Sequence, residues 1–535
     1  MTRTPDSTET SAHHGVPFSA EVRETHTAAL FFAADRVYKM KKPVDLGFCD
    51  FTTVERRRDA CEREVRLNRR LSPDAYLGVS QVLAPDGRVA EHLVVMRRMS
   101  PRTRLARLVR EGEPVDDHLR AIARLLAAFH AGAHRGPEVD AEGTVIAAGR
   151  RWHGVHVGLR RFAGTLLDAD VVDEVCLSST EFLAGRDALF TARIAAGRIL
   201  DGHGDLLADD IFCLPDGPRV LDCLEFDDRL RFVDGLDDAA FLAMDLEHLG
   251  SRELAERFLE LYAEFGADPA PVALHHHHVA YRAAVRAMVT CLRADQGGGG
   301  ADDARSLLGL AAEHLAAGRV RLVLVGGLPG TGKTTVAGGL ADALGMTVLS
   351  SDRIRKELAG LDPLAPAGAG YREDLYALSH TDATYAEMLR RAADLLARGE
   401  SVVLDASWTS SHRRTAAVTL AERTHSRFTA LRCTAPAAVT STRITSRRGS
   451  ASDATPLVAA VMCLDADPWV EAHTVDTSGG PEESIAAAAA AAVHDRRSVG
   501  SWTEVRGRGG VPLKRTGFGG GSDPTETEPV TKAGA

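Results

Sequence analysis

The segment from Gly327 to Thr334, with the sequence GLPGTGKT, fits the phosphate-binding pattern G-x-x-x-x-G-K-[ST]. An apolar, β-branched run precedes it at Arg319–Val325, and a segment with helical character follows at Thr335–Leu344. A phosphate-binding loop (P-loop) needs this order of strand, glycine-rich turn and helix. Glycines let backbone N–H groups face a phosphate, and the helix N-terminus adds partial positive charge. The segment therefore predicts a nucleotide-binding α/β domain.

The chemistry of a P-loop gives its residues distinct roles. We expect Lys333 to contact the β- and γ-phosphates of ATP, and the hydroxyl of Thr334 to hold Mg²⁺. ATP and Mg²⁺ are therefore the expected cofactors. The residues predicted to bind the nucleotide here are Gly327, Leu328, Pro329, Gly330, Thr331, Gly332, Lys333, Thr334 and Thr335.

Length and composition restrict the class of protein. A chain of 535 residues, 44% of them hydrophobic, has room for two large domains or for three to four smaller ones. A formal net charge of −10 argues against a nucleic-acid partner. No apolar run is long enough to span a bilayer, and the first residues lack the apolar core of a signal peptide. Eight cysteines without a C-x-x-C pair predict reduced thiols, so we expect a cytoplasmic protein.

Shifts in composition predict the domain boundaries. Four consecutive glycines predict a linker at 295–303, because such a run does not hold regular structure cheaply. The polar residues 1–17 and the Gly- and Thr-rich residues 498–535 predict disordered ends. The two predicted domains are therefore 18–294 and 304–497.

Periodicity predicts a different fold for each domain. Strand-like segments at Thr27–Phe32 and Asp35–Lys41, followed by a helical segment at Glu55–Leu71, predict a small β lobe. Mostly helical patterns continue from Asp117 and predict a helical lobe. After the P-loop, strands alternate with helices, which is typical of a parallel sheet covered by helices. The predicted fold class is thus an α+β, two-lobed domain followed by an α/β P-loop domain.

A second group of catalytic residue types lies in the first domain. His203-Gly204-Asp205 is followed five residues later by Asp210, and then by a strand that ends near Asp222. This series resembles the H-G-D-x-x-x-x-N loop and the later metal-binding aspartate of the aminoglycoside phosphotransferase family, which is kinase-like. The resemblance implies that Asp205 accepts or orients the proton of a substrate hydroxyl, and that Asp210 and Asp222 bind Mg²⁺. Asp210 departs from the family asparagine and adds negative charge near the phosphates.

Two upstream residues extend this resemblance. Lys39 resembles the strand lysine that pairs with nucleotide phosphates, and Lys41 is an alternative because it lies on the same strand face. Glu64 resembles the helix glutamate that pairs with this lysine, with Glu62 as the less favoured alternative. Lys39 and Glu64 are therefore expected at the nucleotide site.

The region after the P-loop resembles small P-loop kinases of the gluconate-kinase, polynucleotide-kinase and zeta-toxin type. Their D-x-x-R pattern matches Asp352 and Arg355, which implies a general base and an arginine that holds acceptor or phosphate. A helix N-cap is the alternative role of Asp352. Asp405 ends an apolar strand, as in a Walker B motif, and is expected near Mg²⁺.

Three arginines further along resemble the lid arginines of such kinases, which close over the transferring phosphate. They are Arg443, Arg447 and Arg448, and Arg447 is the residue to which we assign the role. A solvated basic helix is the alternative interpretation of this group.

Taken together, the chain resembles the bacterial bifunctional family usually described as aminoglycoside phosphotransferase/ATP-binding protein. In that family a kinase-like domain is fused to a gluconate-kinase-like P-loop domain of the AAA family. The resemblance covers about residues 18–495 and implies ATP-dependent phosphotransfer to a hydroxyl of a small molecule. It names neither the acceptor nor the oligomeric state.

Two other functions and one other site stay open at this point. The first domain would, in one alternative, be a pseudokinase that binds a ligand and regulates a P-loop ATPase switch. In the other, the second domain would phosphorylate polynucleotide ends. The histidine run His275–His278 is also a candidate metal site, although only every third or fourth residue of a helix shares a face.

Overall fold

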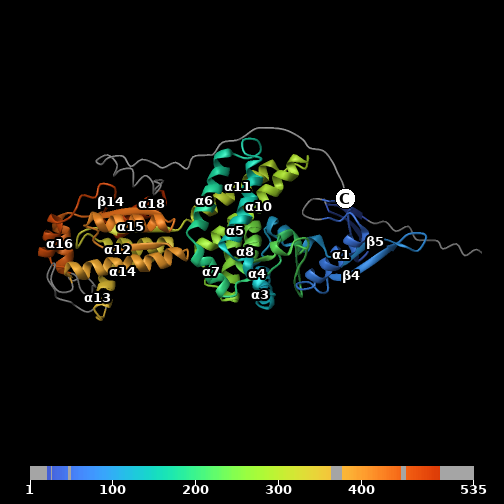
Figure 1. Ribbon diagram of the computed structural model, residues 1–535, viewed down its shortest axis with the longest axis horizontal. Helices are drawn as coiled ribbons and strands as arrows, with labels where there is room; N and C mark the ends of the chain where they lie inside the picture. The colour runs from blue at the N-terminus through green and yellow to red at the C-terminus, as the bar shows by residue number, and fades with distance from the viewer. Residues whose placement is uncertain (1–20, 26, 46–49, 363–375, 447–453, 495–535) are drawn as a thin grey trace, which may run out of the picture.

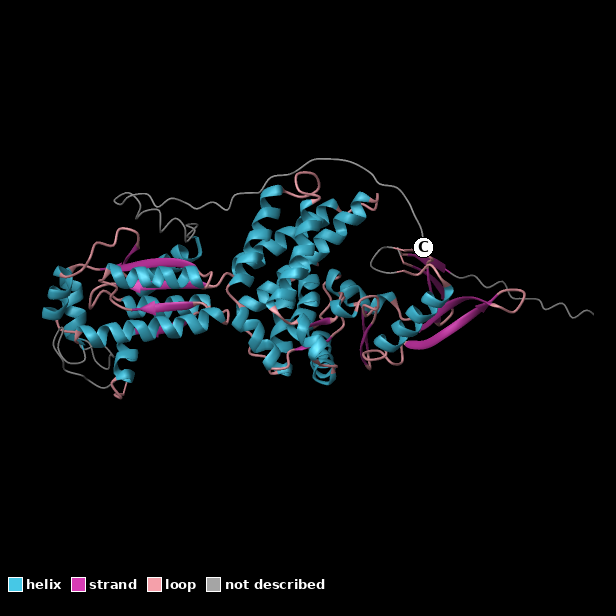
Figure 2. Cartoon of the chain, in the orientation of Figure 1, coloured by secondary structure: helices cyan, strands magenta, loops and turns pink. Residues whose placement is uncertain are grey.

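The computed structural model describes residues 21–25, 27–45, 50–362, 376–446 and 454–494. A β lobe (blue), a helical lobe and an α/β domain (orange) follow one another along the long axis of the molecule (Figure 1). Helices dominate the middle part, and strands gather at the two ends (Figure 2). The predicted fold class is confirmed. The ends expected to be disordered, 1–17 and 498–535, lie outside the described residues.

The β lobe is an antiparallel sheet covered by one helix. The sheet has the order β1-β2-β3-β5-β4, and helix α1 packs on β4 and β5. The alternating apolar side chains of β3 and β5 meet the apolar face of α1 in a small core that includes Val37, Val65 and Val94. The elements of this lobe are β1 (Glu21–Glu24), β2 (Ala28–Ala33), β3 (Arg36–Lys41), α1 (Val54–Asn68), β4 (Tyr76–Leu83) and β5 (Val89–Arg97).

The helical lobe surrounds two short two-stranded sheets, next to which the second group of candidate residues lies. Strand β6 pairs with β9, and β7 pairs with β8. Its strands and short helices are η1 (Pro101–Thr103), β6 (Ile199–Asp201), η2 (Ala208–Asp210), β7 (Ile211–Leu214), β8 (Gly217–Val220), η3 (Asp228–Leu230) and β9 (Phe232–Asp234). Its longer helices are α2 (Leu105–Arg110), α3 (Asp116–Gly132), α4 (Pro137–Glu142), α5 (Val145–Arg160), α6 (Ala169–Ala184), α7 (Asp187–Ala195), α8 (Gly235–His248), α9 (Arg252–Gly266), α10 (Val272–Asp295) and α11 (Ala301–Ala317).

The glycine run at 297–300 forms the turn between α10 and α11. These two helices pack against each other, and α11 also packs on α6 and α8 of the helical lobe. Helix α11 then leads directly into β10, the strand before the P-loop. The run therefore lies inside a helical hairpin, at some distance along the chain from the α/β domain.

The α/β domain has a five-stranded sheet of order β11-β12-β10-β13-β14, in which all neighbouring strands are parallel. Since parallel strands share one direction, the P-loop after β10 opens at their carboxyl edge. Its strands are β10 (Arg321–Gly326), β11 (Thr347–Ser350), β12 (Val402–Asp405), β13 (Arg427–Thr434) and β14 (His473–Asp476). Its helices are α12 (Lys333–Leu344), α13 (Ser351–Leu358), α14 (Leu378–Ala397), α15 (Ser411–Arg423), α16 (Ala437–Ser446), α17 (Pro456–Leu464) and α18 (Pro481–His494).

One hydrophobic core joins the helical lobe to the α/β domain. It contains Leu308 and Leu315 of α11 as well as Leu322 of β10, Met388 of α14 and Phe428 of β13. Burial of apolar surface therefore holds the two parts together. Among the described residues, no helix combines the length and apolar character that a membrane crossing would need.

Candidate functional site

Two lysines of β3 share one buried carboxylate in the β lobe. Lys39 Nζ lies 2.9 Å from Glu64 Oε1, and Lys41 Nζ lies 2.7 Å from Glu64 Oε2. Lys39 also contacts Asp222 Oδ1 at 2.7 Å, whereas Lys41 pairs with Glu225. The structure thus brings the predicted residues Lys39, Glu64 and Asp222 together. Lys41 shares Glu64 but pairs with Glu225 in place of Asp222.

Helix α1 positions Glu64 by ordinary helix physics. The Thr53 hydroxyl caps the helix by accepting the N–H of Arg56 at 3.3 Å. Cys61 and Val65 share the buried face with Glu64 and pack into the core of the β lobe. Anchoring this face turns the Glu64 carboxylate inward, where its side chain is fully buried.

Asp238 of α8 holds the loop that carries Asp205. Its carboxylate accepts the backbone N–H of His203 at 2.7 Å and that of Gly204 at 2.8 Å. The same carboxylate lies 2.9 Å from Nε2 of His130 on α3. Burial raises the pKa of Asp238, but the bond to His130 and the backbone N–H groups reverse this and hold it well below the usual range. Sequence reasoning missed Asp238, because its partners are backbone groups about 35 residues away.

The three carboxylates of this site are electrically coupled. Burial raises the pKa of Asp205 to about 6, and burial together with the charges of Asp222 and Asp205 raises the pKa of Asp210 well above its ordinary value. The charge of Lys39 lowers the pKa of Asp222. Asp222 also has φ +62°, a left-handed conformation that side chains rarely adopt.

The P-loop is tight enough to require its glycines. Gly330 and Gly332 both have φ +79°. A Cβ on Gly330 would lie 2.6 Å from the carbonyl oxygen of Thr440, and a Cβ on Gly327 would lie 2.7 Å from that of Cys433. The predicted residues Leu328, Pro329 and Thr331 lie in this turn, and Lys333, Thr334 and Thr335 form the first turn of α12.

Thr334 and Asp405 meet at the carboxyl edge of the sheet. The Thr334 hydroxyl donates to Asp405 Oδ2 at 2.9 Å, while Asp405 Oδ1 is buried without a hydrogen-bond partner. Burial raises the pKa of this carboxyl. An unpaired carboxylate oxygen beside a hydroxyl suits Mg²⁺, which is commonly held by one or two protein oxygens plus substrate phosphates. The described chain contains no group of three or more His, Cys, Asp or Glu side chains that could hold a metal ion.

Asp352 and Arg355 form an ion pair on α13, with Oδ1 and Nη1 3.0 Å apart. The N-cap of α13 is Ser350, and Asp352 is already inside the helix, so the N-cap role considered for Asp352 is wrong. Arg355 is buried and lies 4.6 Å from the ring centroid of Tyr376. The ion pair therefore holds the two side chains in a fixed position relative to each other.

Of the three lid arginines, Arg447 and Arg448 lie outside the described residues. Arg443 of α16 donates from Nη2 to the carbonyl oxygen of Thr477 at 2.7 Å, and its Nη1 is buried without a partner. The Thr477 hydroxyl in turn donates to the carbonyl oxygen of Thr331 at 2.7 Å. Arg443 is thus linked to the P-loop through Thr477, a residue that no sequence motif indicated.

The histidines of the run 275–278 point to different partners. His276 Nδ1 lies 3.0 Å from His314 Nδ1, and His277 Nε2 accepts the indole N–H of Trp152 at 3.2 Å. His278 lies 3.6 Å from Asp237. Because the rings diverge, this run does not form a metal site.

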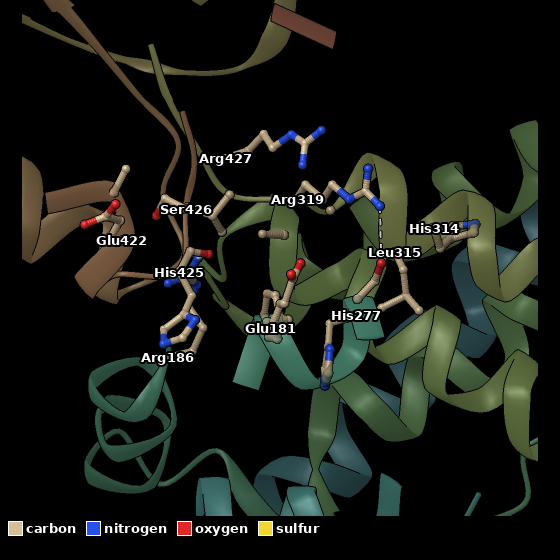
Figure 3. Close-up of a pocket in the computed structure, with 16 residues that line it drawn as sticks. Glu181, Arg186, His277, His314, Leu315, Arg319, Glu422, His425, Ser426 and Arg427 are labelled. Carbon is tan, nitrogen blue, oxygen red and sulfur yellow. Dashed lines mark hydrogen bonds between the residues drawn. The ribbon is translucent and has the colours of Figure 1, made fainter. Parts of the chain in front are cut away.

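A cavity of about 310 Å³ lies where the helical lobe meets the α/β domain (Figure 3). Arg186 at its side donates to the carbonyl oxygen of Thr424 at 2.7 Å, at the C-terminus of α15, where the helix dipole favours a cation. Across the same junction, Arg319 donates to the Ser178 hydroxyl at 3.2 Å. The cavity borders the start of β13 and so lies at the sheet edge opposite the P-loop.

The chain is similar to known proteins in sequence and in structure. A family model described as an AAA domain matches residues 322–463. A choline/ethanolamine kinase family protein from Mesorhizobium loti is 13% identical, with 57% of this chain and 94% of that chain covered and a TM-score of 0.35. A gluconokinase from Sinorhizobium meliloti 1021 is 19% identical, with 35% and 95% covered and a TM-score of 0.24.

The chain is also similar over most of its length to a mycobacterial protein. The chain is 45% identical over 467 residues to the uncharacterized protein Rv2004c of Mycobacterium tuberculosis. The aligned residues cover 87% of this chain and 94% of the relative. The alignment is long enough to include both the two-lobed part and the P-loop domain. The chain therefore belongs to the same protein family as Rv2004c.

Proposed function

We propose that the protein is an ATP-dependent phosphotransferase with two nucleotide sites, each of which transfers the γ-phosphate to a hydroxyl of a small molecule. One observation carries the proposal. Lys39, Glu64 and Asp222 come together from the two lobes at one site, while a complete P-loop stands at another. Two separate groups of phosphotransfer residues are hard to explain in a pure binding protein.

At the first site, the positively and negatively charged side chains would have different roles. Lys39, oriented by Glu64, would hold nucleotide phosphates, and the Asp205 carboxylate would take the proton of the acceptor hydroxyl. Asp222 and Asp210 would hold Mg²⁺, which when bound neutralises phosphate charge. The raised pKa of Asp210 supports this assignment, because burial and then the charges of Asp222 and Asp205 cause it, and a bound cation would offset those charges.

At the second site, backbone N–H groups of the P-loop and Lys333 would hold the phosphates, and Thr334 with Asp405 would hold Mg²⁺. Asp352 would receive the acceptor proton, and Arg355 would keep that carboxylate in place. The unpaired Nη1 of Arg443 supports a role for this arginine at the transferring phosphate. The role expected of Arg447 stays a prediction.

The test is Mg²⁺-dependent phosphate transfer by the full chain and by two variants, Lys333→Ala and Asp205→Ala. A panel of sugars, polyols and aminoglycosides serves as acceptors. We expect each substitution to remove a separate, acceptor-dependent part of the activity. If Lys333→Ala removes all turnover and Asp205→Ala changes none, the first site is not a kinase. If neither site binds ATP with Mg²⁺, the whole proposal fails.

A further inference from the structure

Helix α10 presents a row of arginines along one side. Arg286 follows Arg282 by four residues and Arg293 follows it by eleven. Around the axis of an ideal helix, these positions are rotated from Arg282 by only about 40° and about 20°. All three therefore share one face. This face is turned toward the catalytic loop, because Arg282 Nη1 lies 3.4 Å from the carbonyl oxygen of Gly204, the neighbour of Asp205.

The three arginines differ in how their charge is balanced. Arg282 is buried and makes a two-pronged ion pair with Asp237, at 2.8 and 3.1 Å. Neither Arg286 nor Arg293 forms an ion pair or a side-chain hydrogen bond among the described residues. Arg286 is half-buried and Arg293 is exposed. Two positive charges therefore remain available to a ligand.

These charges act on the catalytic carboxylate itself. Burial is the main influence on the pKa of Asp205, and the charge of Arg286 is the next and opposes it, followed by Asp222. Arg286 also opposes the rise that burial causes in the pKa of Asp245, whose carboxylate accepts the N–H of Ala208 at 2.8 Å. Arg286 thus lies close to both α8 and the catalytic loop.

Charges of both signs therefore influence Asp205. Asp210 and Asp222, which suit a metal and nucleotide, supply the negative charge, and Arg286 and Arg293 supply positive charge that no ion pair balances. A polycationic acceptor would be repelled by these two arginines, whereas an anionic one would be drawn to them. An aminoglycoside, which carries several ammonium groups, is the wrong kind of molecule for this surface.

We propose that the acceptor of the first site is a hydroxyl compound that carries an anionic group, a carboxylate or a phosphate, bound by Arg286 and Arg293. This inference rests on the proposed function. In the reaction, the bond between the γ-phosphorus and the bridging oxygen of ATP breaks, and a bond forms from that phosphorus to the acceptor oxygen. The hydroxyl proton goes to Asp205, and ADP leaves. The anionic group itself does not react.

The first experiment measures phosphate transfer in a full-length Lys333→Ala background, which silences the P-loop. The acceptors are glucose, glucosamine, gluconate, glucose 6-phosphate and kanamycin, so that charge varies and carboxylate is separated from phosphate. We expect transfer to an anionic compound, with kcat/KM lowered about tenfold or more by Arg286→Gln. Arg257→Gln, which removes an exposed arginine of α9, is the matched control and leaves kcat/KM unchanged.

The second experiment needs no turnover. Phenylglyoxal modification of arginines is mapped by peptide mass spectrometry with phosphate, gluconate or chloride present. We expect phosphate or gluconate to protect Arg286 and Arg293 but not Arg257. Transfer to neutral or cationic compounds only, unaffected by Arg286→Gln, overturns the inference and leaves the proposed function intact. Protection without transfer to any compound keeps the anion site and rejects the proposed function, and absence of protection rejects the anion site.

Discussion

Lys39 Nζ and Asp222 Oδ1 lie 2.7 Å apart although 183 residues separate them in the chain. Lys39 belongs to the β lobe, and Asp222 follows the β7–β8 hairpin of the helical lobe. Burial works against the charge on Lys39, but Asp222 and Glu64 outweigh it and hold the pKa of the lysine well above its ordinary value. The ion pair therefore ties the two lobes together at the point where phosphates and metal are expected.

Replacement of Lys39 should weaken the binding of nucleotide phosphates at the first site. In the Lys333→Ala background, Lys39→Met is expected to lower ATP turnover by about tenfold to a hundredfold, because a charged, buried hydrogen-bond donor contributes about 1.5–3 kcal/mol. The control is Lys42→Met, which removes a more exposed lysine that pairs with Glu24 at 2.9 Å. Equal turnover in the two variants would exclude Lys39 from the nucleotide site.

The first site should lose activity in mild acid. Asp205 has a pKa of about 6, raised by burial, and it must be ionised to take a proton. Turnover in the Lys333→Ala background is expected to rise with pH through about 6. Because the folded-state pKa is raised, the contribution of Asp205 to stability is complete below its unfolded pKa, about 3.9, and is lost as pH rises through the folded value. A flat pH–rate profile between about pH 5 and 7 would contradict this assignment.

The P-loop should not tolerate a methyl group at Gly330. Gly330→Ala is expected to abolish ATP binding at the second site, since φ is +79° and the new Cβ would lie 2.6 Å from the Thr440 carbonyl oxygen. Gly338→Ala is the matched control. A Cβ at Gly338 meets nothing within 4 Å, and in the interior of a helix it should stabilise the fold by about 0.5–1 kcal/mol. Nucleotide titration by calorimetry, together with thermal unfolding, separates the two outcomes.

Asp405 should show opposite effects on stability and on metal dependence. Burial raises the pKa of its carboxyl, and Oδ1 has no partner, so Asp405→Asn removes a buried charge. We expect the ligand-free variant to unfold at the same or a higher temperature, while its second site needs at least tenfold more Mg²⁺ for half-maximal turnover. Asp394→Asn on α14, an exposed aspartate paired with Arg390, is the control for a change of net charge. An unchanged Mg²⁺ requirement would exclude Asp405 as a metal ligand.

Sequence patterns predicted those parts of the two sites that are formed by one continuous segment of the chain. The P-loop is one continuous segment, and its strand and helix were expected within about two residues of β10 and α12. The pairing of Lys39 with Glu64 followed from a resemblance in residue order. The sequence did not predict that Lys39 and Lys41 share Glu64. Two lysines on one strand face are equally good partners for Glu64 until the position of α1 is known.

The residues missed by the sequence are those whose partners are backbone groups far along the chain. Asp238 accepts two backbone N–H groups of the loop that carries Asp205, and the Thr477 hydroxyl donates to the P-loop carbonyl oxygen of Thr331. Any aspartate or threonine could do this, so no local pattern marks them. Composition alone also did not show where the glycine run lies. It predicted a linker, and in the structure the run forms the turn between the packed helices α10 and α11. The predicted domain boundaries stay predictions.

The direction of the parallel sheet has a consequence for metabolism. The amino edge of the strands faces the helical lobe, and the P-loop opens at the carboxyl edge, away from it. The first site lies beyond the helical lobe, at its junction with the β lobe (Figure 1). A product made at one site would therefore have to pass through bulk solvent before reaching the other. Within one molecule, the two reactions would be linked by diffusion and by the shared supply of ATP, without substrate channelling.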